Sequence, residues 1–530
     1  MRTNLLISYL LILLSGQCFA QTTGNSVPDP KKSDFIGELG FLSSDWMEGR
    51  EAGTRGSFMA ADYIRSRMMQ LGLKPVAGKD DKKPYFQDFD IIRYKTVSAE
   101  LGLVTQTGHG QIQENFRYGI DFVTEAGPAG IQATAPVRFV GYGISAPLLG
   151  YDDYKKTDVR DCIVVMMAGF PGAHDTLSEG WKKFGHGDME RYRDIATRKQ
   201  TAFKKGALAI LLVSPHNGSG FQPGPQANLN EVKSSVSLFG REDPVYEDDN
   251  YALVFDSVSL PVFTLGTAAT ARLLAGTGIN LQEAERMAAS KLLSQAAEIA
   301  GKMVNLTVEV KAEALLVRNV LGYIPGVDTT KTIVIGAHYD HLGTRNGLIY
   351  NGADDNASGV AGMLAIAGVW SRSGIKPGCN MIFAAWAAEE KGLLGSSWFV
   401  NHFDDSRQSI RLNVNFDMIS RSDPNDTAGK IISIGFLRGT DNLKSMAASL
   451  NGNLHRPFEL DLWETTGHGG SDYAPFAMRK IPVMSFFSGY HNDYHSPRDI
   501  FAQSDSVKME AILKLANDII REFIFPVQHR

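Results

Sequence analysis

Two neighbouring glutamates, Glu389 and Glu390, come directly after the almost wholly apolar run at residues 381–388. An apolar strand at this place would supply a rigid, dry support for both carboxylates. A nearby metal ion would keep the two side chains ionised. One glutamate can then bind metal while the other stays free as a base beside a metal-activated water.

Further polar residues stand where other apolar runs end. These are His338 and Asp340 after TIVIGAHYD, Asp354 and Asp355 in NGADDNASG, Asp417 after RLNVNFD, and His491 and His495 in YHNDYHSPRD. Because ligands gather beyond the carboxyl ends of the strands in open α/β sheets, we expect these residues to converge on one rim. Carboxylates mixed with imidazole suit zinc, or less readily manganese or cobalt, and two close metals need a bridging carboxylate.

The elements that must position these residues alternate along the chain. After about residue 303, strand-like runs such as TIVIGAH, NMIFAAWAA and IPVMSFFS alternate with helical runs such as SGVAGMLAIAGVW and a long terminal helix over 505–523. Two helical patterns lie in 33–73 and strands in 86–118. The pattern predicts an α/β fold with a mixed, largely parallel central sheet and helices on both faces.

Residues 126–302 have a different texture, with short β runs such as VRFVGYGI, CIVVMMAGF and GALAILLVS and a basic helix across 189–205. This texture predicts an inserted β-rich domain. The expected organisation is therefore a signal peptide over 1–20, the first part of the main domain over 21–125, the insert over 126–302, and the rest of the main domain over 303–530.

The N-terminus, MRTNLLISYLLILLSGQCFAQ, has the layout of a secretory signal cleaved near Ala20. A membrane anchor and a lipid-modified Cys18 are the competing interpretations. Removal of the signal takes away Arg2 and changes the formal charge from −5 to −6, which does not favour nucleic acid as a partner. No later segment is long and apolar enough to cross a membrane. Cys162 and Cys379 would be the remaining cysteines, and the sequence leaves their pairing open.

Five motifs, HYDHLG, GADDNASG, WAAEEKGLLGS, NFDMIS and YHSPRD, resemble those of the co-catalytic di-zinc exopeptidase family, which includes bacterial leucyl aminopeptidases and glutamate carboxypeptidase. The resemblance covers residues 33–125 and 303–530 and implies the zinc-exopeptidase fold, which is phosphorylase/hydrolase-like. The insert, with FVGYGI, YDDYKKTDVRDCIVVM and KKGALAILLVS, is similar to the protease-associated domain often found within these enzymes.

This resemblance implies two zinc ions that share Asp355 as a bridge. The implied ligands are His338, Asp355 and Asp417 for one ion, and Asp355, Glu390 and His495 for the other. In relatives, a cis peptide bond follows the bridging residue, and here it would join Asp355 to Asn356. The helix after it should start near Ser358.

The catalytic roles follow from the same resemblance. Glu389 matches the general base, and Asp340 matches a carboxylate that accepts the second ring N–H of the His338 imidazole. Tyr494 matches a phenol that polarises the substrate carbonyl in some members of the family. Tyr473 stands where many relatives carry histidine.

Several neighbouring polar residues are open to a supporting role. His341 is either a support for the ligands or a surface group, and Asp354 is expected to support its loop. Arg498 and Asp499 are expected to pair with each other or with the backbone. Two further positions stay open: His468 is in a simple turn or at the pocket edge, and Asp472 caps the next helix or meets substrate.

The function implied is an exported zinc aminopeptidase, either periplasmic or secreted, that hydrolyses the N-terminal residue of peptides by metal-activated water. Its expected partners are peptides with a free N-terminus. A carboxypeptidase or dipeptidase of the same family is an alternative, but the motif loops show no arginine cluster for a terminal carboxylate. A glutaminyl cyclase would need only one zinc, and a non-catalytic binding protein should have lost ligands. Side-chain specificity and oligomeric state stay open.

Overall fold

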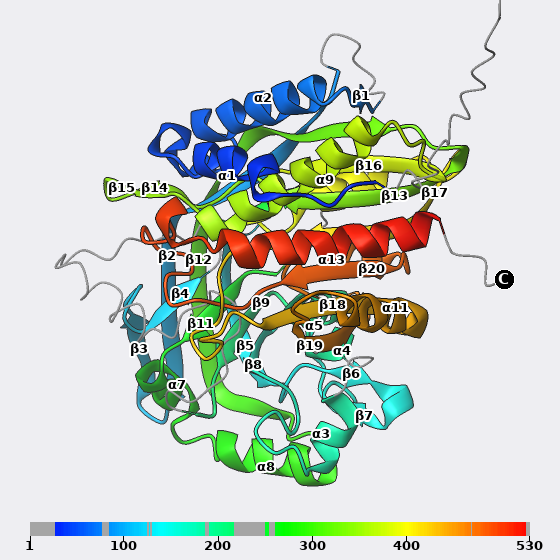
Figure 1. Cartoon of the computed structure of the whole chain (residues 1–530). Coiled ribbons are helices and arrows are strands. Elements are labelled where there is room, and N and C mark those ends of the chain that lie inside the picture. The colour runs from blue at the N-terminus through cyan, green and yellow to red at the C-terminus, as the bar shows by residue number, and fades with distance from the viewer. Residues whose placement is uncertain are drawn as a thin grey trace, which may run out of the picture.

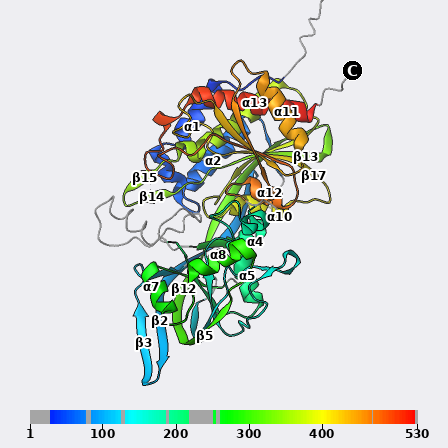
Figure 2. The ribbon, with the colours of Figure 1, turned by 90° about the horizontal axis from the view of Figure 1, so that it is seen from below.

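The computed structural model describes residues 27–76, 84–124, 127, 130–185, 190–216, 250–253, 260–467 and 469–525. The predicted signal segment and His468 lie outside the described residues. Figures 1 and 2 show two lobes joined by long strands, one containing α2, α9 and α13 and the other containing α3, α7 and α8. None of the described helices has the length and apolarity that a membrane crossing requires.

The first lobe is built on a sheet with the strand order β19-β18-β20-β17-β13-β16-β12. Its four central strands, β20, β17, β13 and β16, are parallel, whereas β12 and β18 are antiparallel to their inner neighbours. The bounds are Asp328–His338 (β13), Cys379–Trp386 (β16), Ser409–Phe416 (β17), Ile431–Leu437 (β18), Glu459–Thr465 (β19) and Val483–Phe487 (β20). The predicted mixed, largely parallel sheet is confirmed.

Helices cover both faces of this sheet. One face packs against α1 (Ile36–Leu42), α2 (Arg55–Gln70), α9 (Gly359–Ser373), α11 (Asp441–Gly452) and α13 (Ser506–Ile524), and the other against α10 (Leu394–His402) and α12 (Tyr473–Met478). Successive side chains of β16 alternate between the two cores, with Phe383 on the first face and Ala384 and Trp386 on the second. Burial on both faces explains why this strand reads as a continuous apolar run.

The second lobe continues the sheet from β12 through β5, β8, β9, β11 and β4. Its strands are β4 (Phe122–Thr124), β5 (Ile131–Phe139), β8 (Ile163–Met167), β9 (Ala209–Val213) and β11 (Val262–Leu265), and its helices are α3 (Glu179–Phe184), α4 (Glu190–Arg193), α5 (Ile195–Lys204), α7 (Thr267–Leu274) and α8 (Leu281–Lys291). Its larger core also takes in Leu101 and Val304, which lie on either side of the predicted insert. The boundaries at 126 and 302 stay a prediction.

Two long antiparallel strands, β2 (Phe86–Thr107) and β12 (Ala297–Ile324), run side by side and connect the lobes. Shorter pieces complete the fold: β1 (Lys74–Pro75), β3 (Gly110–Phe116), β6 (Ser145–Ala146), β7 (Tyr151–Asp152), β10 (Asn250–Leu253), β14 (Gly343–Arg345), β15 (Leu348–Tyr350), the 3₁₀ helices Lys32–Asp34, Asp45–Arg50, Pro147–Leu149 and Phe501–Gln503, and the π-helical turn Ala353–Ser358.

The helix predicted across 189–205 is two helices, α4 and α5, which meet at Asp194. The Asp194 carboxylate accepts hydrogen bonds from the backbone N–H groups of Ala196 and Thr197 and so caps the start of α5. A capping residue requires a non-helical backbone, and this ends the first helix. Cys162 and Cys379 are both buried and unpaired.

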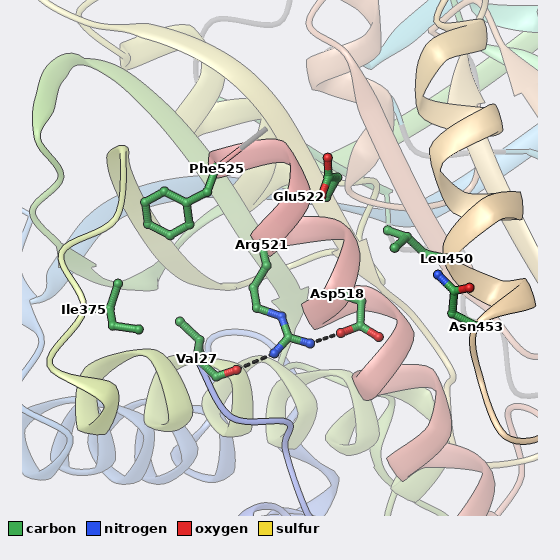
Figure 3. A pocket seen from close by; sticks show the side chains of 8 residues that line it. All are labelled: Val27, Ile375, Leu450, Asn453, Asp518, Arg521, Glu522 and Phe525. Atoms are coloured by element: carbon green, nitrogen blue, oxygen red, sulfur yellow. Dashed lines mark hydrogen bonds and ion pairs between the residues drawn. The ribbon is translucent and has the colours of Figure 1, made fainter. Parts of the chain in front are cut away.

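A surface pocket of about 400 Å³ lies beside the end of α13, where the first described residues meet that helix (Figure 3). Arg521 donates a hydrogen bond to the Val27 carbonyl and pairs with Asp518. Its guanidinium also lies 2.8 Å from the Asp29 carboxylate. The arginine therefore attaches the first described residues of the chain, which have no regular secondary structure, to α13.

We expect Asp153, a fully buried carboxyl in the second lobe, to make stability depend on pH. Burial raises the pKa of Asp153 from its ordinary value of 3.8 to about 7, although its Oδ2 accepts the Ile144 N–H at 2.9 Å. Between these values the folded chain holds a proton that the unfolded chain has released, so stability falls as pH rises through this window. The loss should be a few kcal/mol, up to about 4.

The substituted side chain in Asp153→Asn cannot ionise, so the variant should not lose this stability as pH rises. Its free energy of unfolding should therefore increase relative to that of the unaltered protein. Denaturant unfolding at pH values below and above the window measures this difference. Parallel stability curves for the two proteins would contradict the assignment.

Candidate metal centre

The rim beyond the central parallel strands gathers the predicted residues. His338 is the last residue of β13, and it is in parallel register with Trp386 at the end of β16, three residues before Glu389. Asp417 follows β17 directly, and His495 lies in the loop after β20. The end of each strand therefore delivers one part of the site, as the sequence predicts.

Two groups of potential metal ligands share Asp355. In the first, His338 Nε2 lies 3.4 Å from Asp355 Oδ1 and 3.5 Å from Asp417 Oδ1. In the second, His495 Nε2 lies 3.1 Å from Asp355 Oδ2 and 3.3 Å from Glu390 Oε2. The two oxygens of Asp355 thus face different histidines, which is the arrangement that a bridging carboxylate needs.

His341 also belongs to the second group. Its Nδ1 lies 2.7 Å from Glu390 Oε1 and 3.7 Å from Asp355 Oδ2, and the side chain is fully buried. Burial settles the open question about His341: it is not a surface group but supports Glu390. Within each group the candidate ligand atoms lie within 4.8 Å of one another.

The donor set fits two divalent cations. Burial alone would raise the pKa of Asp355 and Glu390, but the facing histidines outweigh it, lowering the pKa of Asp355 well below its usual range and that of Glu390 to about 2. Both carboxyl groups are therefore in the ionised form that binds metal. His495 Nε2 faces two carboxylates without making a well-formed hydrogen bond to either.

Glu389 lies beside the first group but belongs to neither. Its Oε2 is 3.9 Å from His338 Nε2, and its side chain lines a pocket that also contains Asp417 and Tyr494. Burial and the nearby carboxylates raise the pKa of Glu389 well above its usual value. The Glu389 side chain therefore lies next to the candidate ligands but is not part of either ligand group.

The position of Asp340 differs from the prediction. His338 Nδ1 faces the main-chain carbonyl of Asp340 at 3.2 Å, whereas the Asp340 carboxylate is 4.0 Å away. That carboxylate instead accepts the backbone N–H groups of Glu389, at 3.1 Å, and Glu390, at 3.4 Å. Asp340 thus orients the histidine through its backbone and the two glutamates through its side chain.

Hydrogen bonds with two neighbouring segments hold the loop that carries Asp355. The Asp355–Asn356 peptide bond is cis, as the resemblance implied, and α9 begins at Gly359. Asp499 accepts the backbone N–H of Asp355 at 3.0 Å, and Asp354 accepts the N–H of Ser420 at 2.6 Å. Asp354 is therefore a loop support, as predicted.

The predicted partners of Arg498 and Asp499 are right only for Asp499, which binds backbone. Arg498 Nε donates to Asp493 Oδ1 at 2.7 Å instead. His491, which was expected at the rim, lies behind it, with Nε2 3.5 Å from Asp354 Oδ2. Asp472 precedes α12, but its carboxylate accepts no capping hydrogen bond, so the capping alternative is wrong. Burial raises the pKa of Asp472 to about 7.

Arg50 is the main residue of the site's support that the sequence reasoning missed. It is fully buried, and its guanidinium donates to the carbonyls of Tyr339 at 2.7 Å, Asn351 at 2.6 Å and Gly352 at 2.8 Å. It also donates to the Leu42 carbonyl at 2.5 Å. One side chain thus joins the loop after His338 to the loop before Asp355.

Ser471 was also missed, although it precedes Asp472 in the glycine-rich segment that drew attention. Its hydroxyl donates to Asp417 Oδ2 at 2.6 Å. The other carboxylate oxygen of Asp417 faces His338. A serine beside two glycines is a weak signal, because such segments are usually simple turns.

The pocket over the two groups has a volume of about 120 Å³. Beyond the candidate ligands it is lined by Met418, Trp463, Gly470, Ser471, Tyr473, Ser485, Phe487, Tyr490 and Tyr494. The Tyr494 ring stacks on His495 with centroids 3.8 Å apart, and Tyr490 packs against it edge-on at 4.9 Å. Aromatic rings therefore form much of the wall next to the second group.

Residues 319–520 match the sequence profile of peptidase family M28. The chain contains a peptidase family M28 domain. Both groups of candidate ligands lie inside the M28 domain, whereas Arg50 and the predicted insert lie outside it. The M28 domain therefore draws part of its support from a segment that precedes it by more than 250 residues.

Similar proteins include leupeptin-inactivating enzyme 1 of Streptomyces exfoliatus, which is 33% identical over 174 residues, 32% of this chain and 36% of that protein. Probable leucine aminopeptidase 2 of Aspergillus oryzae is 29% identical over 282 residues, 49% of this chain and 52% of that protein. The matched part of the chain thus spans about a third to a half of these curated relatives.

The fold is similar to that of a solved aminopeptidase from Aneurinibacillus sp. strain AM-1. The comparison has a TM-score of 0.58 and covers 95% of this chain and 98% of the other, at 18% sequence identity. The likeness extends well beyond the M28 domain and includes both lobes. At this identity it shows the fold alone.

Proposed function

We propose that the chain is an exported metallo-aminopeptidase that binds two zinc ions and releases the N-terminal residue of peptides. The observation that carries the proposal is the pair of ligand groups that share Asp355, with Glu389 beside them in one pocket. Two relatives, a probable leucine aminopeptidase and a leupeptin-inactivating enzyme, support a peptide substrate.

In this proposal the residues at the strand ends hold the metals. His338 and Asp417 would bind one ion, Glu390 and His495 the other, and Asp355 both. When bound, the two zinc ions would lower the pKa of a shared water and polarise the scissile carbonyl. His341 keeps Glu390 in place through its 2.7 Å contact.

Glu389 carries the proton transfers. Its carboxylate takes a proton from the attacking water, whose oxygen bonds to the carbonyl carbon, and the same carboxyl group then protonates the departing amine nitrogen. The Asp340 carboxylate fixes the backbone of Glu389 for this work. Tyr494, which lines the pocket at the second group, would donate a hydrogen bond from its hydroxyl group to the developing oxyanion.

The walls of the pocket favour an apolar N-terminal side chain. Met418, Trp463, Phe487 and Tyr490 line it beyond the ligands and would contact the residue to be released. Among the described lining residues there is no lysine or arginine, which a terminal carboxylate would require. This absence favours an aminopeptidase over a carboxypeptidase.

A panel of chromogenic aminoacyl substrates, N-blocked peptides and free-carboxylate dipeptides tests the reaction. We expect hydrolysis of leucyl and aromatic aminoacyl substrates and none of N-blocked peptides. Cleavage that depends on a free C-terminus would replace the proposal by a carboxypeptidase. Cyclisation of N-terminal glutamine, or the absence of any turnover in zinc-loaded protein, would favour a cyclase or a binding protein.

Removal of metal should abolish turnover, because Glu389 alone cannot take a proton efficiently from a water whose pKa has not been lowered by bound zinc. Treatment with a chelator, followed by dialysis, is expected to give protein with no measurable leucyl-substrate hydrolysis, and titration with Zn²⁺ should restore it with two ions per active site. Recovery complete at one ion per chain would contradict the two-metal proposal.

Export and the insert complete the proposal. The N-terminal sequence supports cleavage after Ala20, so mass spectrometry of protein secreted by its host should find Gln21 at the N-terminus. We further propose that 126–302 is a protease-associated domain, on the strength of its sequence texture. An intact Met1 in exported protein would overturn the cleavage.

A further inference from the structure

We propose that His174, His216 and Glu285, in the second lobe, form an additional zinc site that is separate from the pair of sites in the M28 domain. The candidate ligand atoms of these three residues lie within 4.8 Å of one another. None of the three residues lines the pocket that contains Glu389. Two imidazoles and one carboxylate, with a water in the fourth position, are a common ligand set for zinc.

The topology explains how three distant residues meet. Strands β8 and β9 are parallel neighbours, with Met167 paired to Val213 at their carboxyl ends. The chain that leaves β8 carries His174, and the chain that leaves β9 carries His216. Both therefore emerge at the same edge of the sheet, where α8 brings Glu285, just as strand ends build the site in the first lobe.

The side chains already face one another. Glu285 Oε2 lies 2.6 Å from His216 Nε2, and the rings of His174 and His216 meet edge-on with centroids 4.6 Å apart. The Glu285 and His216 side chains are partly buried, whereas His174 is exposed. An ion can therefore reach the cluster from solvent, and a small separation of Glu285 from His216 would admit it.

All three ligands lie on segments that other hydrogen bonds hold. Gln282, one turn before Glu285 on α8, donates to the Pro215 carbonyl at 2.8 Å and so joins the helix to the residue before His216. The Ser214 hydroxyl accepts the backbone N–H of His216 at 3.2 Å. His174 lies in a turn closed by a hydrogen bond from the Asp175 N–H to the Gly172 carbonyl at 3.0 Å. Because these segments are already ordered, metal binding costs less conformational entropy.

An ion at this place would join the ends of β8 and β9 to α8. In Figure 1, α8 lies at the end of the second lobe opposite to α2 and α9 of the first. The site would therefore act on the second lobe and leave the chemistry at Glu389 unchanged. This separation allows it to be tested independently of the proposed peptidase activity.

The test is the zinc content of the full chain, loaded with Zn²⁺ and then dialysed against zinc-free buffer. Elemental analysis should find one ion fewer per chain in His174→Ala and in Glu285→Gln than in unaltered protein, with unchanged hydrolysis of leucyl substrate. His109→Ala, which removes an exposed histidine from the turn between β2 and β3, is the matched control and should keep every ion.

The expected quantity is a difference of one ion, so it does not depend on how many ions the M28 domain holds. Equal zinc content in His174→Ala and unaltered protein would overturn the site, and so would an equal loss in His109→Ala. His174 is exposed, so its replacement should leave the fold intact, and circular dichroism checks this. If the difference appears but no peptide is cleaved, the site stands and the proposed function fails.

Discussion

Glu389→Gln is expected to lower kcat by about 10²- to 10⁴-fold while the chain keeps its full zinc content, the effect of removing a general base. The amide has nearly the same shape as the carboxyl group but cannot take a proton from water. The Glu389 side chain lies in neither ligand group, so its replacement leaves the contacts among Asp355, Glu390 and His495 in place. The measurement pairs steady-state kinetics with elemental analysis of the same sample.

Glu390→Gln is the matched variant one residue away. It removes a charge that faces His341 at 2.7 Å and His495 at 3.3 Å, so we expect loss of one zinc ion per chain and restoration of part of the activity at high zinc concentration. If Glu389→Gln also loses metal, Glu389 is a ligand. If Glu389→Gln keeps its activity, it is not the base.

The strand ends could be predicted from the sequence because two signals coincide there. Apolar runs such as the one before Glu389 identify strands buried on both faces, and parallel order brings their ends to one rim. The resemblance then assigned Asp355, Glu390 and His495 to one group, and these side chains do meet. The roles of Glu389 and Tyr494 stay predictions, since geometry alone does not test a proton transfer.

Contacts between side chains and backbone could not be predicted in this way. The family resemblance pairs the Asp340 carboxylate with the ring of His338, but which oxygen of Asp340 faces the ring depends on the turn after β13. The sequence leaves open whether His341 supports the ligands or lies on the surface, because a single histidine in a loop has no pattern that predicts its burial. In the second lobe, no sequence pattern connects His174 with His216, since only the parallel pairing of β8 and β9 brings them together.

Arg50→Met is expected to destabilise the fold by about 3–5 kcal/mol, the usual result of removing one partner from a buried charged network. The methionine fills part of the volume but removes the donor from the carbonyls of Leu42, Tyr339 and Asn351. The Gly352 carbonyl also loses Arg50 but keeps the Ala357 N–H at 3.2 Å. Burial lowers the pKa of Arg50 to about 10, and Asp355 and Asp499 act in the opposite direction. The guanidinium thus remains charged near neutral pH and also offsets the negative charge of the site.

The same change should reach the metal centre. Arg50 contacts the loop after His338 and the loop before Asp355 at once, so its loss allows one ligand group to move relative to the bridge. We therefore expect zinc affinity and kcat to fall even at temperatures where Arg50→Met is fully folded.

Arg55→Met is the control, since the Arg55 side chain is 77% exposed and its pairing with Glu48 contributes at most about 1 kcal/mol. If Arg50→Met matches that control in melting temperature and zinc content, Arg50 is not what holds the two loops in register. If Arg50→Met has a lower melting temperature but the same zinc affinity as the unaltered protein, Arg50 stabilises the fold without positioning the metal ligands. The strand ends of the first lobe would then position those ligands without help from the N-terminal segment.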